Sequence, residues 1–310
     1  MKEYHGINSY TNNRSSVVTI GTFDGVHLGH TAILNHLITA AKESDLDSVI
    51  LTFFPHPRMI LQKEFQLKLI NSINEKKELL EKSGLDHLVI HPFTKEFSRL
   101  NASDYVRDFL VNRLHVKKVI IGYDHRFGRN RNATIEDLRE FGKTYGFEVI
   151  EISAQQLNEV SVSSTKIRNA LNNGDIEKAN AYLGYPFMLS GIIVEGRGIG
   201  KTLDFPTANL KIDEDYKLIP KIGVYIVRSE INGKMVYGIT NIGVNPTVGG
   251  SKRTIETYFL DFNDDLYNKK IRLELLKRIR DEEHFGSIDE LRSSIKKDET
   301  FARAFLEKYA

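Results

Sequence analysis

The stretch that most constrains the fold lies near the N-terminus. There a β-branched apolar run at residues 17–20 precedes Gly21-Thr22-Phe23-Asp24-Gly25-Val26-His27-Leu28-Gly29-His30. Apolar residues then recur at helical spacing as far as Ala41, so the pattern predicts a strand, a glycine-rich turn and the start of a helix. The first N–H groups of a helix lack internal partners and favour an anion, and glycine lets the backbone approach a ligand closely. Because the two histidines would share the first helical turn, we expect a phosphate to bind there.

The first half of the chain alternates between predicted strands and helices. Strands are expected at 17–20, 48–54, 88–90, 119–121 and 147–152. Helices are expected from the turn onward, from the capping box at Ser72 to Gly84, over 101–114 and from Thr134. This alternation predicts an α/β domain with a doubly wound parallel sheet. In such sheets, ligands bind beyond the carboxyl ends of the strands.

Three further stretches follow predicted strands and so fall at the same edge. They are Phe54-Pro55-His56-Pro57-Arg58, the segment Gly122 to Gly128 with Asp124 and His125, and Val162-Ser163-Ser164-Thr165-Lys166-Ile167-Arg168. Hydroxyls and free N–H groups at a helix start suit a phosphate, and Lys166 and Arg168 add positive charge. Each stretch alone also has a structural interpretation. The serines could be ordinary helix caps, and the prolines could mark a simple turn.

The pattern changes near Gly184, where helical periodicity gives way to short strands. These are expected at 191–194, 224–229, 236–242, 255–261 and 271–276, with Asn232-Gly233 as a hairpin turn. We expect an antiparallel β-barrel, closed by two helices at 288–295 and 300–309. The predicted domains are therefore residues 1–183 and 184–310.

A glycine-rich segment in the second half ends like a nucleotide-binding P-loop. In Gly196-Arg197-Gly198-Ile199-Gly200-Lys201-Thr202, however, Glu195 stands where that motif needs its first glycine, and no helix follows. A loop that covers phosphates with its backbone remains reasonable. Directly after it, Thr207 and Asn209 are two residues apart, so on an extended segment both side chains point the same way. Their oxygens suit Mg²⁺, although both residue types are also common in loops.

Composition limits the classes of function. The chain contains no cysteine, which excludes disulfides and thiolate metal sites and fits a reducing compartment. Its net charge of +2 gives no strong global field for binding nucleic acid. The N-terminus lacks the apolar core of a signal peptide, and no apolar run is long enough for a membrane span. We expect a cytoplasmic protein without nucleic acid or membrane partners, and weak self-association stays open.

The first half resembles the FMN adenylyltransferase module of bacterial FAD synthetases. The resemblance rests on G-x-F-D-G-x-H-x-G-H at 21–30 together with S-S-T-x-x-R at 163–168, and His125 departs from the usual Phe. It implies adenylyl transfer from ATP to FMN, with charge on the phosphates stabilised by His27, His30, Lys166, Arg168 and Mg²⁺. It implies ATP contacts from Phe23, Asp24, Gly25, His27, His30, Asp124, Ser163, Ser164, Thr165, Lys166 and Arg168, and flavin near Phe54, Pro55, His56 and Arg58.

The second half resembles the riboflavin kinase module of the same bifunctional enzymes. The matching features are the glycine-rich loop leading to P-T-A-N at 206–209, the segment 241–247 and Glu256. Lys201, Asp204, Asn268 and His284 depart from common family residues. The resemblance implies that Glu256 is the general base for the ribityl hydroxyl and that Thr207 and Asn209 hold Mg²⁺. It implies ATP contacts from Gly196, Gly198, Gly200, Lys201, Thr207 and Asn209. Riboflavin, FMN, FAD and ATP would be the substrates and products.

Other classes of protein explain the sequence less well. A nucleotidylyltransferase with another acceptor would need no P-T-A-N element and no Glu256. A class I aminoacyl-tRNA synthetase would need a basic surface for tRNA, and the charge balance gives no sign of one. A regulatory flavin- or nucleotide-binding protein would tolerate loss of His27, His30 or Glu256, yet all three are present. A zinc site at His27 and His30 lacks a third ligand at a suitable spacing.

Overall fold

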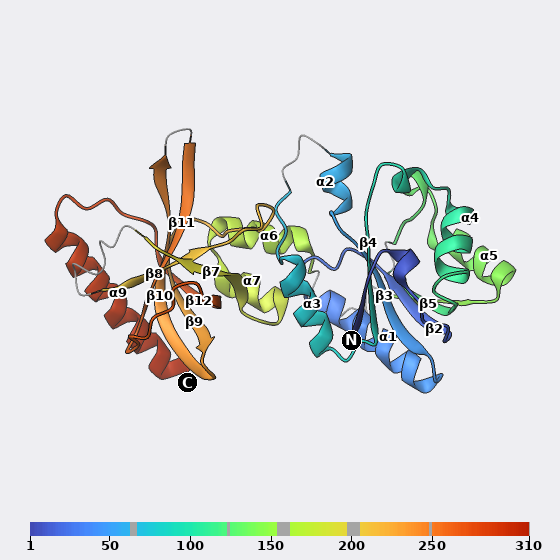
Figure 1. The fold of residues 1–310 in the computed structure, drawn as a ribbon, viewed down its shortest axis with the longest axis horizontal. Coiled ribbons are helices and arrows are strands. Elements are labelled where there is room, and N and C mark those ends of the chain that lie inside the picture. Colours follow the sequence, from blue (N-terminus) through green and yellow to red (C-terminus); the bar gives the residue numbers. More distant parts are fainter. Residues whose placement is uncertain (63–66, 123–124, 154–161, 197–204, 248–249, 310) are drawn as a thin grey trace. The chain divides into compact units, whose positions relative to one another are not determined.

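The computed structural model describes residues 1–62, 67–122, 125–153, 162–196, 205–247 and 250–309. Its contacts divide the chain into two compact units. The first comprises Met1–Leu69 and Ile73–Ser163, and the second comprises Ile70–Ser72 and Ser164–Ala310. Figure 1 shows the helices and strands of both units.

The first unit is built on a six-stranded parallel sheet in the order β1-β4-β3-β2-β5-β6. The strands are β1 (Lys2–His5), β2 (Ser16–Ile20), β3 (Asp47–Phe53), β4 (His87–His91), β5 (Val116–Gly122) and β6 (Glu148–Ile152). The five predicted strands are confirmed. The edge strand β1 was not predicted, because its Lys-Glu-Tyr-His sequence is polar and only Tyr4 is buried.

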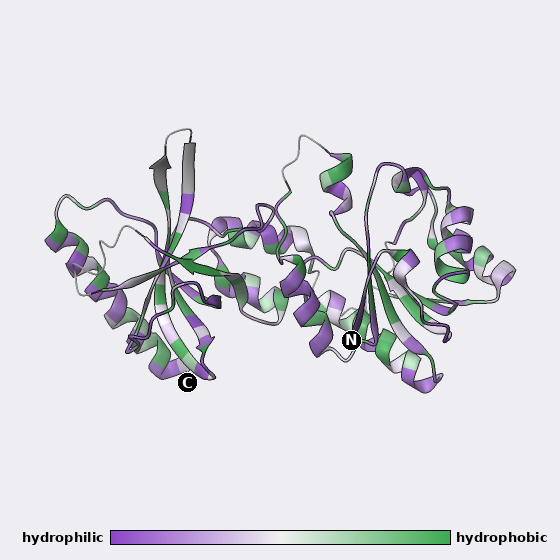
Figure 2. Ribbon diagram, viewed as in Figure 1, coloured by the Kyte–Doolittle hydropathy of each residue, from purple (hydrophilic) through white to green (hydrophobic). Residues whose placement is uncertain are grey.

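Helices cover both faces of this sheet, as expected for a doubly wound fold. On one face, Val17, Ile50, Leu88 and Ile120 pack against α1 (Leu28–Glu43) and α3 (Ile73–Lys82). Their neighbours along the strands point to the other face. There they pack against α4 (Ala102–Tyr105), the following turn Val106–Val111 and α5 (Ile135–Tyr145). Figure 2 shows hydrophobic residues along these central strands.

Two predicted helices of this unit have informative ends. The helix expected over 101–114 begins at the cap residue Asn101, but from Val106 to Val111 the chain winds as a π-helix rather than an α-helix. Tyr105, Leu110 and Leu114 of the segment 101–114 are nevertheless buried, as a helical stripe of apolar residues would be. At α5, Thr134 and Asp137 form a reciprocal capping box, and Gly146 ends the helix in the left-handed conformation.

The second unit contains a closed antiparallel barrel in the order β10-β11-β8-β7-β12-β9, as predicted. The strands are β7 (Phe187–Val194), β8 (Thr207–Lys211), β9 (Gly223–Ile231), β10 (Lys234–Thr247), β11 (Gly250–Phe259) and β12 (Lys270–Arg280). Asn232 and Gly233 join β9 to β10 with φ of 53° and 76°, the geometry of a two-residue hairpin.

The prediction of two closing helices is wrong, because α9 runs unbroken from Ile288 to Tyr309. The polar residues 296–299 suggested a break. In the structure, Asp298 is buried and receives a two-pronged ion pair from Arg280 on β12, at 3.0 and 2.8 Å. Apolar and polar residues alternate along α9 (Figure 2), and its Ala302 and Phe305 pack on the barrel.

Two short helices, α6 (Ser164–Asn173) and α7 (Ile176–Leu183), belong to the second unit. The Asn180 side chain explains part of this packing, because it donates to the Leu275 carbonyl at 2.8 Å and accepts from the Phe187 amide at 2.7 Å. The contact division at residues 163 and 164 thus comes earlier in the chain than the predicted functional boundary at 183 and 184.

Candidate functional site

The order of the strands locates the first site. β3 and β4 follow β2 on one side of it in the sheet, whereas β5 and β6 lie on its other side. The loops after β2 and β5 therefore diverge at their carboxyl ends, where open α/β sheets bind ligands. Residues 21–27 follow β2, and the segment of Asp124 and His125 follows β5. Asp124 lies outside the described residues.

The loop after β2 adopts a backbone that few sequences tolerate. Phe23, Gly25 and Val26 have φ of 46°, 91° and 34°. Glycine accepts such values without strain, but a non-glycine residue in a sparsely populated region costs about 1–3 kcal/mol. The side chains of Phe23 and Val26 are buried in the core beneath α1, at 2% and 6% exposure. Burial of these side chains holds the loop in its strained shape.

The two predicted histidines lie together at the start of α1. His27 is the N-cap, and its Nδ1 accepts a hydrogen bond from the His30 amide at 3.4 Å. Their rings stack with centroids 3.7 Å apart. Burial, then the neighbouring His27 and Lys76, hold the pKa of His30 well below its usual value. His30 is therefore a neutral imidazole near pH 7, able to donate one hydrogen bond.

Lys76 is a residue of this site that the sequence analysis missed. It lies on α3 with 3% exposure, and its ammonium donates to the Thr22 carbonyl at 2.7 Å. Burial lowers the pKa of Lys76, and the carboxylate of Asp24, fully buried in the same loop, opposes that shift. The sequence signal was a lysine inside an otherwise amphipathic helix, which is ordinarily a solvated position.

The predicted flavin segment follows β3 and forms α2 (Pro57–Leu61). His56 is its N-cap, with Nδ1 accepting from the Arg58 amide at 3.1 Å. Phe54, Pro55 and His56 are half-buried, while Arg58 is exposed. The segment thus extends from the carboxyl end of the strand next to β2.

The S-S-T-x-x-R element starts α6 as predicted. Ser164 is the first residue of this ten-residue helix, and Ser163, Thr165 and Lys166 are exposed while Ile167 is buried. Arg168 is half-buried one turn further along. The N-terminus of α6 thus carries hydroxyl groups beside the first N–H groups of the helix, an arrangement that favours binding of an anion.

The second candidate site lies on the barrel wall around Asn209. Asn209 on β8 pairs with Val194 on β7 and, on the other side, with Glu256 on β11. Residues directly opposite in an antiparallel pair send their side chains to the same face. Thr207 lies two residues before Asn209 and pairs with Tyr258, so its side chain leaves the same face of β8. The buried Ile255, Thr257 and Phe259 alternate with these residues and point to the other face.

The described part of the glycine-rich loop meets this row. A Cβ placed on Gly196 would lie 2.1 Å from Asn209 Nδ2 and 2.8 Å from its Oδ1. Only a glycine lets the backbone pass so close to the amide. Gly198, Gly200, Lys201 and Asp204 lie outside the described residues.

Two side chains that the sequence analysis did not assign extend the row. Asn241 on β10 is the partner of Glu256 on its other side, and its amide donates to Glu282 at 3.5 Å. Beyond Glu282 the chain borders a shallow cavity of about 470 Å³. It is lined by Glu283, His284, Phe285, Glu290, Ser293, Ser294 and Lys297. The register of three strands thus places Asn209, Glu256 and Asn241 side by side, and Asn241 extends the row to Glu282.

Comparison with known proteins gives the same two parts in the same order. The family model described as FAD synthetase matches residues 9–166, and that described as riboflavin kinase matches residues 183–306. A curated protein from Listeria monocytogenes, described as bifunctional riboflavin kinase/FMN adenylyltransferase, is 36% identical over 95% of this chain and 93% of its own length. An Escherichia coli K12 protein with the same description is 36% identical over 98% of both.

A solved structure shares the whole fold. It is titled as a macrolide-efflux protein from Streptococcus pneumoniae, with a TM-score of 0.89, 30% identity and coverage of 98% of this chain and 99% of that one. In the part of this chain that the structure describes, no helix combines the length and apolarity needed to cross a membrane. The two family models and the full-length relatives agree, and the chain belongs to the family of bacterial bifunctional riboflavin kinase/FMN adenylyltransferases.

Proposed function

We propose which residues of this chain carry out the two reactions of its family. The chain phosphorylates riboflavin to FMN and transfers the adenylyl group of ATP to FMN, giving FAD and pyrophosphate. We assign adenylyl transfer to residues 1–183 and phosphorylation to residues 184–310. The observation that carries the assignment is the register that sets Glu256 opposite Asn209, because it supports a base beside phosphate and metal ligands.

In adenylyl transfer, a phosphate oxygen of FMN attacks the α-phosphorus of ATP, and the bond to the pyrophosphate oxygen breaks. The nucleophile is already an anion, so the protein's task is positioning and charge stabilisation. Neutral His30, with His27 stacked on it, donates a hydrogen bond to the phosphates, and Lys166 and Arg168 supply positive charge. We assign further ATP contacts to Phe23, Asp24, Gly25, Asp124, Ser163, Ser164 and Thr165, and flavin contacts to Phe54, Pro55, His56 and Arg58.

In phosphorylation, Glu256 takes the proton of the ribityl 5′-hydroxyl as its oxygen attacks the γ-phosphorus of ATP, and ADP leaves. A carboxylate within hydrogen-bond reach of that hydroxyl is the requirement for general base catalysis. The backbone of Gly196, with Gly198, Gly200 and Lys201, covers the phosphates.

The donor set at Thr207 and Asn209 fits Mg²⁺. A hydroxyl and an amide oxygen on one face of β8 are the hard oxygen ligands that this ion prefers. When bound, Mg²⁺ would neutralise charge on the transferred phosphates.

The partners that we propose are the small molecules ATP, riboflavin and FMN. The net charge of +2 argues against nucleic acid, and the absence of cysteine supports a cytoplasmic location.

One assay tests the assignment as a whole. Pure protein is incubated with riboflavin, ATP and Mg²⁺, and the flavins are separated by chromatography. We expect FMN first and FAD after it. Absence of both products contradicts the proposal, and FMN without FAD leaves only the kinase assignment standing.

A further inference from the structure

Lys76 is a buried cation that neither proposed reaction uses directly. Its side chain is 3% exposed on α3. Burying an ammonium is costly unless it is paired and hydrogen-bonded. What stabilises the Lys76 ammonium is therefore informative: its hydrogen-bond acceptor, Thr22, and the carboxylate that favours its charge, Asp24, both lie in the loop after β2.

These partners stand on either side of Phe23. The ammonium donates to the Thr22 carbonyl at 2.7 Å, on one side of Phe23. The charge of Asp24, on the other side, stabilises the ammonium. The Thr22 carbonyl also accepts from the Thr52 hydroxyl at 3.3 Å. Phe23, between the two partners, has a φ of 46°. Lys76 thus stabilises the residues on both sides of the strained Phe23. The loop must keep this shape to present its N–H groups to a phosphate.

The same loop supports His30. The Phe23 ring lies 5.0 Å from the His30 ring, measured between centroids. Nδ1 of His30 is buried and, among the residues that the structure describes, has no hydrogen-bond partner. Protonation of this imidazole is disfavoured first by burial, then by the neighbouring His27 and by the charge of Lys76.

We propose that Lys76 is a positioning residue for adenylyl transfer, which fixes the Thr22–Asp24 turn and thereby the place of His30 over the phosphates. The inference rests on the proposed site at His27 and His30. Lys76 acts through the loop and does not contact the reacting atoms.

The test compares Lys76→Met with Lys77→Met in the full-length protein. Both changes remove one lysine charge from α3, but Lys77 pairs with Glu3 at 2.6 Å and not with the loop. For Lys76→Met we expect kcat/KM for FAD formation from supplied FMN to fall about 100-fold, the scale of a small misplacement at a reacting centre. FMN formation by the same chain should be unchanged, and Lys77→Met should retain both activities.

The pH profile separates positioning from simple stability. The other buried titratable side chains of the loop, the start of α1 and α3 are Asp24, His27 and Glu75. Without the Lys76 charge, His30 binds a proton more readily, so the acid limb of kcat/KM for FAD formation should move to higher pH. A purely structural lysine would lower the unfolding temperature and leave this limb in place.

Conservative variants keep the proposal testable where Lys76→Met does not fold. Lys76→Arg retains the charge and Lys76→Gln retains only a donor, so Arg should recover more FAD formation than Gln. Wild-type FAD formation in Lys76→Met, or an unmoved acid limb in a folded variant that lacks the charge, Lys76→Met or Lys76→Gln, overturns the proposal. A His30→Ala control that still forms FAD at the wild-type rate instead overturns the underlying site assignment.

Discussion

Glu256 lies directly opposite Asn209 across the β8–β11 ladder, and both side chains leave the same face of the barrel wall. The pairing brings a carboxylate beside an amide whose other neighbour is the backbone of Gly196. Separate strands fix the two residues, so their distance depends on barrel register rather than on a loop. A site built on paired strands is held more firmly than one built on loops alone.

Glu256→Gln tests the general base. The amide keeps the size of the side chain but cannot accept the ribityl proton, so kcat for FMN formation should fall by about 10²–10⁴. FAD formation from supplied FMN should continue at the wild-type rate. The two rates are measured separately by chromatography of the flavins.

Glu274→Gln is the matched control for that experiment. Glu274 lies on β12 of the same barrel and pairs with Arg228 at 2.7 Å, away from the Asn209 row. We expect it to keep kinase activity. Equal losses in the two variants would show that the effect of Glu256→Gln comes from the barrel rather than from proton transfer.

Asn209→Ala tests the assignment of the metal ligand. Loss of one oxygen donor should raise the Mg²⁺ concentration needed for half-maximal FMN formation by ~10-fold or more. The Mg²⁺ dependence of FAD formation should not move, because that reaction is assigned to the other module. A titration of both activities with Mg²⁺ decides the point, and parallel shifts would contradict separate metal sites.

Gly196→Ala tests the close approach to Asn209 without changing any polar group. The added methyl would lie within 3 Å of three Asn209 atoms, so either the loop or the amide must move. We expect FMN formation to fall and FAD formation to persist. A fully active variant would mean that the loop does not need its present path.

His30→Ala tests the first site. Removing one donor aimed at developing charge typically costs ~10²–10³ in kcat, so FAD formation should nearly stop. FMN formation should be spared. His36→Ala is the matched control, because His36 is exposed on the same helix.

Features with local causes could be predicted from the sequence. The helix start at Thr134 and the Asn232–Gly233 hairpin depend on residues within a few positions, and both are confirmed. The turn at 21–30 also carries its own signal, because its glycines and histidines are adjacent in the chain.

Features whose partners are distant could not be predicted. Lys76 is paired with Thr22, 54 residues earlier, and nothing in the sequence of α3 indicates that pairing. β1 becomes a strand because it pairs with β4, from Lys2 beside His87 to His5 beside Ile90. α9 continues through its polar residues because Arg280 pairs with Asp298. In each case a tertiary contact overrides the local pattern.

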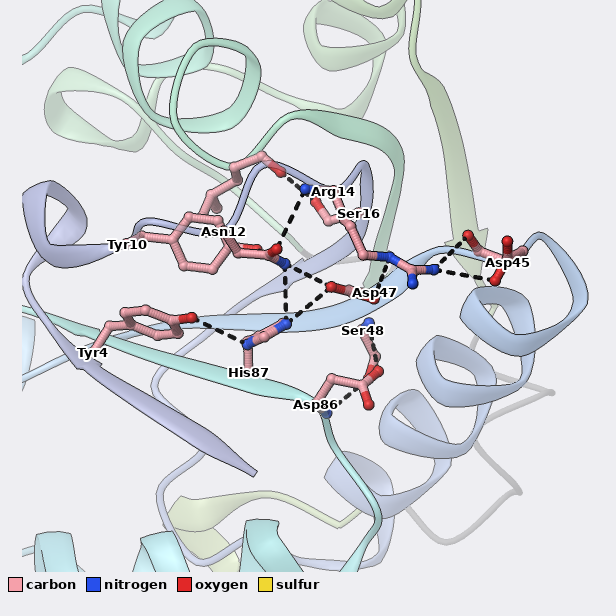
Figure 3. A network of polar contacts seen from close by, with 11 residues as sticks. Tyr4, Tyr10, Asn12, Arg14, Ser16, Asp45, Asp47, Ser48, Asp86 and His87 are labelled. Atoms are coloured by element: carbon pink, nitrogen blue, oxygen red, sulfur yellow. Dashed lines mark hydrogen bonds and ion pairs between the residues drawn. The ribbon is translucent and has the colours of Figure 1, made fainter.

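A polar network at the amino ends of the strands gives a prediction about stability rather than activity (Figure 3). Asp47 accepts hydrogen bonds from Asn12 at 2.6 Å and His87 at 3.0 Å, and Arg14 pairs with it at 3.1 Å. Burial raises the pKa of Asp47, but His87, Asn12 and Arg14 outweigh burial and hold it below its usual value. Asp47 lies at the start of β3, at the edge of the sheet opposite to the proposed site.

Because the folded-state pKa of Asp47 is lowered, its stabilising effect is present above the unfolded pKa and is lost as the pH falls through the folded value. Asp47→Asn should therefore lower the free energy of unfolding of the first unit by about 2 kcal/mol at pH 7. The difference from wild type should shrink below about pH 4, where the unfolded carboxyl binds a proton. Urea unfolding followed by circular dichroism at several pH values measures it, with Asp45→Asn, fully exposed beside Arg14, as the control. A difference that stays constant down to pH 2 would mean that the ionised form of Asp47 does not stabilise the fold.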